Sequence, residues 1–389
     1  MKFLKIITVI LSTLFSFFII YLGLVFYNFS NFNDKQKKFF YNLEISEFHK
    51  KYSLKLHHTR GDNWGTIYDL LIENHNLNEV DLSDESNKKI SKKHQLIFNY
   101  IYETKTDDTI LFQGDSWIEQ YNFYKKSKDS IKSLGINTDM NIINAGISSF
   151  SPTLMKLQYK ILKEDFNINP TIVVGMIDQT DIGDEICRYK NNRVLKQNEV
   201  IAVKPAIHEF PIKWKLTELY YSKKNNFFKS ISLTNFKFKQ FTMKAKNKFY
   251  KFFDKNIKYC AYKDIQSYLI NSNNKNEKYF ANSVKDYLRM LNDDKTIKKI
   301  VLVTFPHKFH FKSNGLKNVK YNVNVSNIVE KIENDFNKLI HINFSKILDS
   351  KVSNINDIWL ENDISSHLKP YYHDNLITKE IINKIKNTK

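Results

Sequence analysis

The sequence is poor in cysteine, glycine, proline and acidic residues. Its 389 residues include two cysteines, nine glycines and six prolines, and no CxxC motif or Cys/His cluster indicates a structural metal site. The 60 Lys and Arg residues outnumber the 41 Asp and Glu residues, which leaves a formal net charge of +19. Because such a composition can arise from an AT-rich genome, the charge alone does not identify a partner. Hydrophobic residues make up 42% of the chain, which argues against wholesale disorder.

The N-terminal segment contains an uncharged stretch that is long enough to cross a bilayer as a helix. The run from Ile6 to Tyr27 is apolar apart from short hydroxyl side chains and one glycine, and as a helix it would be about 33 Å long. A cleaved signal peptide has a shorter apolar region and ends on small residues, so we predict an uncleaved signal anchor over residues 1–28. Lys2 and Lys5 precede the run and predict a cytoplasmic N-terminus, with the rest of the chain exported.

Export has consequences for partners and for the cysteines. A nucleic acid, the usual partner of a basic protein, is not expected outside the cytoplasm. Cys187 and Cys260 could form a disulfide in an oxidising compartment, but two unpaired thiols are equally compatible with the sequence. No cofactor and no metal ion are predicted.

Five short apolar runs alternate with helical patterns and predict an α/β fold. The segment 29–104, which precedes all of them, is polar and helix-prone, and we interpret it as a membrane-proximal stalk and helical cover. Residues 105–389 form the main domain, with an insertion at about 186–290. Short unalternated runs predict a parallel sheet covered on both faces, and a helix is expected to begin at Ser151 and Pro152. The runs are 110–113, 140–144, 171–177, 298–307 and 338–348.

The middle of the insertion is rich in lysine and aromatic residues. Residues 213–258 contain thirteen lysines, and Glu218 and Asp254 are the acidic residues. One interpretation is an amphipathic helical lid whose aromatic side chains pack on the core while the lysines face water. The other is a surface for an anionic polymer or lipid headgroups.

A serine follows the first apolar run at the edge where a parallel sheet binds ligands. Gly114-Asp115-Ser116 ends that run, and a nucleophilic serine needs a base, a group that orients the base, and oxyanion donors. After the fifth run, His367 stands where a base is expected, and Asp363 precedes it by four residues. His373 is the alternative base, and we expect it to fall inside the closing helix.

Four blocks in this order resemble the SGNH/GDSL hydrolase superfamily: FQGDSW, NAGISSFSP, VVGMIDQTD and DISSHL. The resemblance covers about residues 107–180 and 298–385. It implies a flavodoxin-like α/β/α three-layer fold with a five-stranded parallel sheet, here joined to an N-terminal transmembrane helix and a helical insertion. It also implies a serine esterase.

The resemblance assigns a role to each matching residue. Ser116 would be the nucleophile and its N–H an oxyanion donor, Gly146 N–H a second donor, and His367 the general base. Asp363 would orient His367, although the family places that acid three residues before the histidine, where this chain has Ile364.

The third block departs most from the family pattern. Ile177 stands where the family has an Asn that donates to the oxyanion, and Gln179 could take over that role. Losing one donor costs on the order of 10²–10³ in rate. Asp115, Asp178 and Asp181 are predicted to bind substrate hydroxyls; a cation site and ordinary capping are the alternatives.

These features predict a membrane-anchored, exported serine esterase. It would remove an acyl group, such as O-acetyl, from an envelope glycan, a related surface molecule or a small ester, in the periplasm or outside the cell. An O-acetyltransferase that uses the same Ser116 and His367 is one alternative. A non-catalytic scaffold that binds glycan or anionic lipid is the other, and Ile177 favours it.

Overall fold

The structure is a computed structural model of the 389-residue chain. The chain divides into two units. The helical unit comprises residues 1–51, 61–76 and 205–258, and the sheet unit comprises residues 52–60, 77–204 and 259–389. The residues described are 2–39, 81–82, 88–90, 100–102, 106–119, 140–203, 219, 222–253, 274–308, 311–312, 315–316, 324–352, 354–361 and 367–387.

A sheet of eight strands forms the centre of the sheet unit. Five of its strands are parallel neighbours in the order β5, β4, β6, β9, β12, and they correspond to the five apolar runs. Numbered along the chain, this is the order 2-1-3-4-5 of flavodoxin-like folds. The predicted parallel α/β architecture is therefore confirmed. The strands are β4 (Thr109–Gly114), β5 (Asn141–Gly146), β6 (Ile172–Asp178), β9 (Lys299–Phe305) and β12 (Leu339–Asn343).

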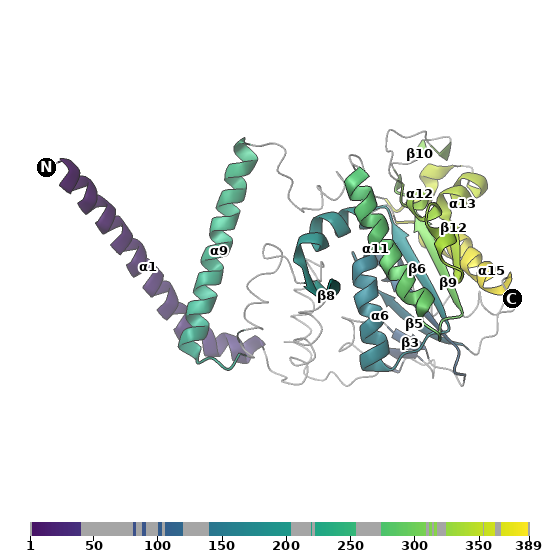
Figure 1. Ribbon diagram of the computed structural model, residues 1–389, viewed down its shortest axis with the longest axis horizontal. Helices are drawn as coiled ribbons and strands as arrows, with labels where there is room; N and C mark the ends of the chain where they lie inside the picture. The colour runs from purple at the N-terminus through teal and green to yellow at the C-terminus, as the bar shows by residue number, and fades with distance from the viewer. Residues whose placement is uncertain are drawn as a thin grey trace. The chain divides into compact units, whose positions relative to one another are not determined.

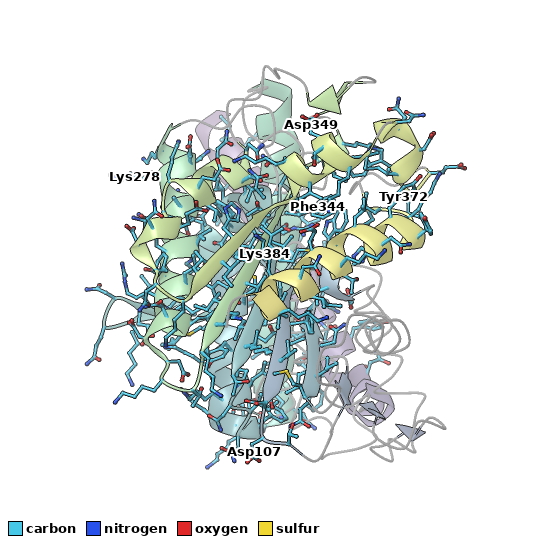
Figure 2. The ribbon with its side chains drawn as sticks, turned by 90° about the vertical axis from the view of Figure 1, so that its right-hand side faces the viewer. Asp107, Lys278, Phe344, Asp349, Tyr372 and Lys384 are labelled. Carbon is cyan, nitrogen blue, oxygen red and sulfur yellow. The ribbon has the colours of Figure 1, made fainter. Side chains whose placement is uncertain are left out.

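Helices cover both faces of the parallel strands, which gives three layers (Figure 1). Helices α6 (Pro152–Phe166) and α11 (Asn274–Asp293) lie together on one face. On the other face lie α13 (Phe344–Lys351) and α15 (Lys379–Asn387). Figure 2 looks onto this second face, with Phe344 between the two helices and the strands behind them.

Burial on both faces explains why these strands are continuous apolar runs. Ile110 and Phe112 of β4 belong to a buried cluster with Phe344 and Ile381, on the face of α13 and α15. Leu111, between them, is also fully buried, and because side chains alternate along a strand it faces the opposite layer. Neither face of β4 is exposed to water.

The segment before β4 adds three short antiparallel strands to the sheet. These are β1 (Asp81–Leu82), β2 (Lys88–Ile90) and β3 (Tyr100–Tyr102), and β3 pairs with β5. The prediction of a helical cover was wrong at these positions. Tyr100–Tyr102 alternates β-branched and aromatic side chains, which favour a strand wherever an unpaired sheet edge is available.

Helix α6 begins where the sequence predicts. Ser151 is its N-cap residue and Pro152 its first residue, which suits proline because the first N–H of a helix has no partner within the helix. The Ser151 hydroxyl, however, donates to Glu185 Oε1 at 2.8 Å rather than capping the helix. Glu185 also accepts from Thr153 N at 2.6 Å, so it takes over the capping role.

The helical unit contains α1 (Lys2–Phe39) and α9 (Asn226–Phe253). Within α1, Lys5–Asn31 is long and apolar enough to cross a membrane, with a mean hydropathy of 2.5. The predicted insertion at 186–290 is therefore not one body. It contributes α9 to the helical unit, whereas the hairpin of β7 (Arg193–Lys196) and β8 (Glu199–Val203) and helix α11 belong to the sheet unit.

One cysteine can be placed. Cys187 is disulfide-bonded, and no free cysteine is found in the described part of the chain. Cys260, the other cysteine of the chain, lies outside the described residues.

Candidate active site

Ser116 occupies the turn between a strand and a short helix. β4 ends at Gly114, and α4 (Ser116–Glu119) begins two residues later. A Cβ atom on Gly114 would lie 2.8 Å from Ile118 Cγ1 and 2.9 Å from the carbonyl oxygen of Met176. Glycine is therefore required for the chain to turn this closely against β6, and the turn places Ser116 at the carboxyl edge of the sheet.

Ser116 and His367 meet directly although 251 residues separate them in the sequence. Ser116 Oγ lies 2.7 Å from His367 Nε2, a distance at which the hydroxyl can donate to an unprotonated ring nitrogen. Short backbone contacts hold the histidine: Leu360 N donates to His367 O at 2.9 Å, and Trp359 forms an antiparallel bridge with Leu368. The structure thus pairs the two residues that the sequence predicts as nucleophile and base.

The indole ring of Trp117 packs against the imidazole of this pair. Its ring centre lies 5.1 Å from that of His367 and 3.9 Å from that of Phe305. On another side it stacks with His373, with ring centres 6.0 Å apart. Its indole Nε1 donates to Asp178 Oδ2 at 2.9 Å. The indole therefore fixes the imidazole of His367 by packing, while its polar edge is satisfied by a carboxylate inside the protein.

His373 is part of the closing helical segment, as predicted. It begins the π-helical turn His373–Thr378, which lies between α14 (Pro370–Tyr372) and α15. The Ser116 hydroxyl bonds His367 and not His373. Among the two candidate bases, the geometry therefore selects His367.

Three buried carboxylates lie close together near Ser116. Asp115, Asp178 and Asp181 are 2%, 3% and 0% exposed, and one oxygen of each lies within 4.8 Å of the others. In the described part of the chain this is the group of side chains that could hold a cation. Their burial argues against the predicted role in binding substrate hydroxyls, because a glycan outside the protein cannot reach them.

The hydrogen bonds of these carboxylates are internal. Asp115 Oδ1 accepts from Trp117 N at 2.9 Å, and Asp178 Oδ1 accepts from Thr180 N at 2.7 Å. Asp181 Oδ2 accepts from Asp178 N at 3.0 Å. These contacts fix the backbone on both sides of the site, at the turn after β4 and at the turn after β6.

Burial sets the protonation of the cluster. Desolvation, together with the charge of Asp178, raises the pKa of Asp115 well above its usual range. Desolvation and the charges of Asp115 and Asp178 raise the pKa of Asp181 in the same way. Burial also raises the pKa of Asp178, but its hydrogen bonds from Thr180 and Trp117 and the nearby His367 oppose that shift. Asp178 is therefore the member best placed to carry the negative charge.

Gly146 has a different role from the predicted oxyanion donor. Its N–H donates to Asn144 Oδ1 at 3.0 Å. A Cβ atom on Gly146 would lie 2.4 Å from Glu119 N and 2.5 Å from Ile118 Cβ. The missing side chain thus lets the nucleophile helix α4, rather than a substrate, approach the end of β5. Asn144 strengthens this contact, because its Nδ2 donates to Ile118 O at 3.0 Å.

Of the three remaining residues discussed for the site, the structure describes Gln179 and Ile177 but not Asp363. Gln179 is fully buried, and its Oε1 accepts from Val325 N at 2.9 Å, at the start of α12 (Val325–Glu330). Ile177 is also fully buried, and its side chain has no hydrogen-bond donor. Asp363 lies outside the described residues, and its role as the partner of His367 stays a prediction.

Two acids that follow the third block, Asp184 and Glu185, hold the loop after β5 and the start of α6. Asp184 pairs with Arg188 at 2.8 Å, and the same guanidinium donates to Ser149 Oγ at 2.9 Å. Glu185 pairs with Arg193 at 2.7 Å in addition to capping α6. For Asp184 and Glu185, ordinary turn and capping chemistry is therefore the correct interpretation.

Sequence reasoning missed two supporting residues. Gln113 is fully buried, and its Nε2 donates to Met155 O at 3.0 Å while its Oε1 accepts from Tyr287 OH at 3.0 Å, which ties β4 to α6 and α11. Trp117 was the second. The sequence did offer a signal for both residues: Gln113 is an amide in an otherwise apolar run, and Trp117 is an indole next to the serine. Both side chains carry polar groups that need hydrogen-bond partners when they are buried.

No protein-family model and no curated protein matches the sequence. Among solved structures, an acetyl-xylooligosaccharide esterase variant from Geobacillus stearothermophilus is similar over 72% of this chain and 95% of its own, with a TM-score of 0.37 and 10% identity. A protein described as a GDSL-like lipase from Parabacteroides merdae is similar over 73% and 99%, with a TM-score of 0.36 and 13% identity. A protein described as an acylhydrolase from Bacteroides fragilis is similar over 73% of this chain and 90% of its own, with a TM-score of 0.32 and 13% identity. Such low similarity carries no functional argument, so the proposal below depends on the site itself.

Proposed function

We propose that this chain is a serine ester hydrolase of SGNH/GDSL type that removes an acyl group, such as O-acetyl, from an envelope glycan or a related surface molecule. The observation that carries the proposal is the 2.7 Å separation of Ser116 Oγ and His367 Nε2 at the carboxyl edge of a parallel sheet. A hydroxyl next to an imidazole that can take its proton is the arrangement used for acyl transfer.

The geometry supports a two-step reaction. Ser116 Oγ passes its proton to His367 Nε2 and attacks the acyl carbon, and His367 then returns the proton to the leaving alkoxide oxygen. Water, deprotonated by His367, attacks the acyl-serine ester and releases the carboxylic acid and the free serine. Trp117 keeps the imidazole in place throughout, because its ring packs against those of both His367 and Phe305.

The backbone N–H of Ser116 is the oxyanion donor that this proposal uses. The Gly146 N–H is bonded to Asn144, and Ile177 replaces the amide of the family pattern. A site with fewer donors than usual is expected to be slow, by on the order of 10²–10³ for each missing donor. We therefore expect turnover of activated esters well below that of an enzyme with a full set of donors.

Labelling with a fluorophosphonate tests the nucleophile. The wild-type chain is expected to be labelled and Ser116→Ala is not, whereas Ser350→Ala, which removes an exposed hydroxyl on α13, should be labelled like the wild type. Equal labelling of Ser116→Ala and the wild type would remove Ser116 from its role and leave the non-catalytic scaffold as the better description.

Hydrolysis and transfer use the same acyl-serine, and a product assay separates them. We expect acetate release from p-nitrophenyl acetate to be unaffected by a soluble acceptor glycan. If the acyl group instead appears on the glycan in preference to water, the chain is an O-acetyltransferase.

We also propose that the sheet unit is exported and held at a membrane by α1. The apolar stretch Lys5–Asn31 supports the anchor, and the disulfide of Cys187 is of a kind that persists in oxidising compartments. In cells whose outer envelope layer has been opened while the cytoplasmic membrane stays intact, an externally added protease should cleave the sheet unit, and a non-reducing gel should show no reaction of Cys187 with a maleimide. Protection from protease until the cells are lysed would place the sheet unit in the cytoplasm.

A further inference from the structure

The candidate membrane helix α1 has a partner within its own chain. Asn28 Nδ2 donates to Thr234 Oγ1 of α9 at 2.7 Å, and Lys237 Nζ donates to Asn28 Oδ1 at 2.8 Å. Closer to the N-terminus of α1, Tyr21 OH donates to Asn235 Oδ1 at 2.8 Å. Hydrogen bonds between polar side chains are a recurring way of joining helices in membranes. Within the helical unit, α9 is thus bound to α1.

Several aromatic residues of α9 are exposed within the helical unit. Phe228, Phe238 and Phe241 are 57%, 57% and 68% exposed. They accompany seven lysines in Asn226–Phe253, a segment that contains no acidic residue. Exposed aromatic side chains combined with lysines are typical of helices that lie in the interfacial region of a lipid bilayer.

A groove of about 600 Å³ lies between the two helices. The helices are close where Phe26 and Phe29 of α1 meet Phe227 of α9, and they spread apart from there (Figure 1). The volume is in the range of sites that bind small organic ligands. The walls are apolar except near Lys237, and they include Phe17, Phe18, Leu24, Lys237, Phe238 and Phe241.

The residues that line the groove indicate which kind of ligand would fit it. Aromatic and aliphatic walls suit a hydrocarbon chain, and Lys237 places an ammonium group on the groove. An ammonium group has three donor hydrogens, so its bond to Asn28 is compatible with a second bond to a phosphate oxygen. The excess of lysine on α9 adds a general attraction for anionic headgroups.

We propose that the α1–α9 groove binds one anionic phospholipid, with an acyl chain between Leu24 and Phe238 and its phosphate at Lys237. The site belongs to the helical unit and requires α1 to be in contact with lipid, but it does not depend on the activity of Ser116. Binding of this lipid would add a second attachment to the membrane beside the apolar surface of α1.

Native mass spectrometry of the full chain in detergent tests the proposal. With phosphatidylglycerol and phosphatidylcholine of identical acyl chains in equal amounts, we expect the wild type to retain one phosphatidylglycerol at least about fivefold more often than one phosphatidylcholine. Leu24→Trp fills the groove and should lower retention of both lipids by a similar factor. Lys237→Gln keeps a donor for Asn28 but removes the charge, and it should abolish the preference for phosphatidylglycerol.

Two variants outside the groove serve as controls. Ile19→Trp adds the same bulk to an exposed position of α1, and Lys239→Gln removes an equal charge from an exposed position of α9; both should bind lipid like the wild type. The proposal is wrong if Leu24→Trp retains both lipids like Ile19→Trp, or if Lys239→Gln loses the preference as fully as Lys237→Gln. It is also wrong if soluble polyphosphate displaces phosphatidylglycerol from the wild type, because α9 would then be a surface for anionic polymers.

Discussion

Trp117 donates from its indole nitrogen to Asp178 Oδ2 across 2.9 Å, and this hydrogen bond joins the turn that carries the nucleophile to the end of the neighbouring strand β6. The same ring contacts the imidazole of His367. One side chain therefore links the turn of Ser116, the imidazole of His367 and the buried carboxylates. Disturbing it should affect catalysis more than substrate binding.

Removal of the indole N–H is the direct test of this link. Trp117→Phe keeps an aromatic ring but leaves Asp178 Oδ2 without its donor, at a cost of about 1–3 kcal/mol in the free energy of unfolding. Because a misplaced base slows the chemical step, kcat for p-nitrophenyl acetate should fall between about 10- and 100-fold with little change in KM. A rise in KM at constant kcat would instead place the indole in the binding of substrate.

The two histidines near Trp117 are distinguished by the same assay. His367→Ala should lower kcat by at least about 10³-fold, since no base remains at 2.7 Å from Ser116 Oγ. His373→Ala removes a ring that stacks on the other side of Trp117 and should lower kcat less than about tenfold. Full turnover of the His367→Ala variant would exclude His367 as the base.

Gly146 should tolerate no side chain because of the helix above it. The added Cβ of Gly146→Ala meets the backbone nitrogen of Glu119, which cannot move without α4. We expect a loss of about 1–3 kcal/mol in the free energy of unfolding and a large loss of kcat, since Ser116 is carried by the same helix. Gly175→Ala in β6 is the matched control, because the nearest atom there is the end of the Leu302 side chain at 3.0 Å, and its melting temperature should change less.

The buried carboxylates should make stability depend on pH. Because the folded pKa of Asp181 is raised, the folded state binds that proton more tightly than the unfolded chain. Stability is therefore highest below the unfolded value of about 3.9 and falls as the pH rises from there through the folded pKa. Asp181→Asn keeps an acceptor for Asp178 N but cannot ionise, so its melting temperature should exceed that of the wild type at pH 8.

The pH dependence separates this effect from a general change in charge. The difference between Asp181→Asn and the wild type should shrink as the pH is lowered toward 4. Asp349→Asn, at an exposed position of α13, should show no such convergence. A difference that stays constant between pH 4 and pH 8 would mean that the Asp181 carboxyl is not responsible for it.

The sequence was informative wherever one local pattern had one structural outcome. The runs 110–113 and 171–177, which alternate with helical patterns, predict strands buried on both faces, and chemistry-bearing residues after such strands meet at one sheet edge. The meeting of Ser116 and His367 could therefore be predicted, although their contact joins residues 251 positions apart. Their order along the chain, together with the resemblance of the four blocks, was sufficient for that step.

Other features depended on contacts that no local pattern encodes. A glycine after a strand suits a close approach by a substrate as well as by a helix, and only the position of Glu119 shows that Gly146 serves the helix. The lysine and phenylalanine pattern of α9 likewise suits a lid and a partner of α1 equally well. Asp115, Asp178 and Asp181 were near the site as expected, but their burial was not visible in the sequence.

The position of α9 in the chain affects how the protein responds to proteolysis. α9 follows β8 and precedes α11, so the sheet unit is covalently connected to the helical unit on both sides of α9 as well as ahead of β1. A single protease cut between residues 40 and 80 would break the covalent connection of α1 to the sheet unit ahead of β1. The connections of the sheet unit to α9 would remain. The hydrogen bonds of Asn28 and Tyr21 to α9 would still hold the cut fragment, and shedding of the sheet unit from the membrane would require further cuts on both sides of α9.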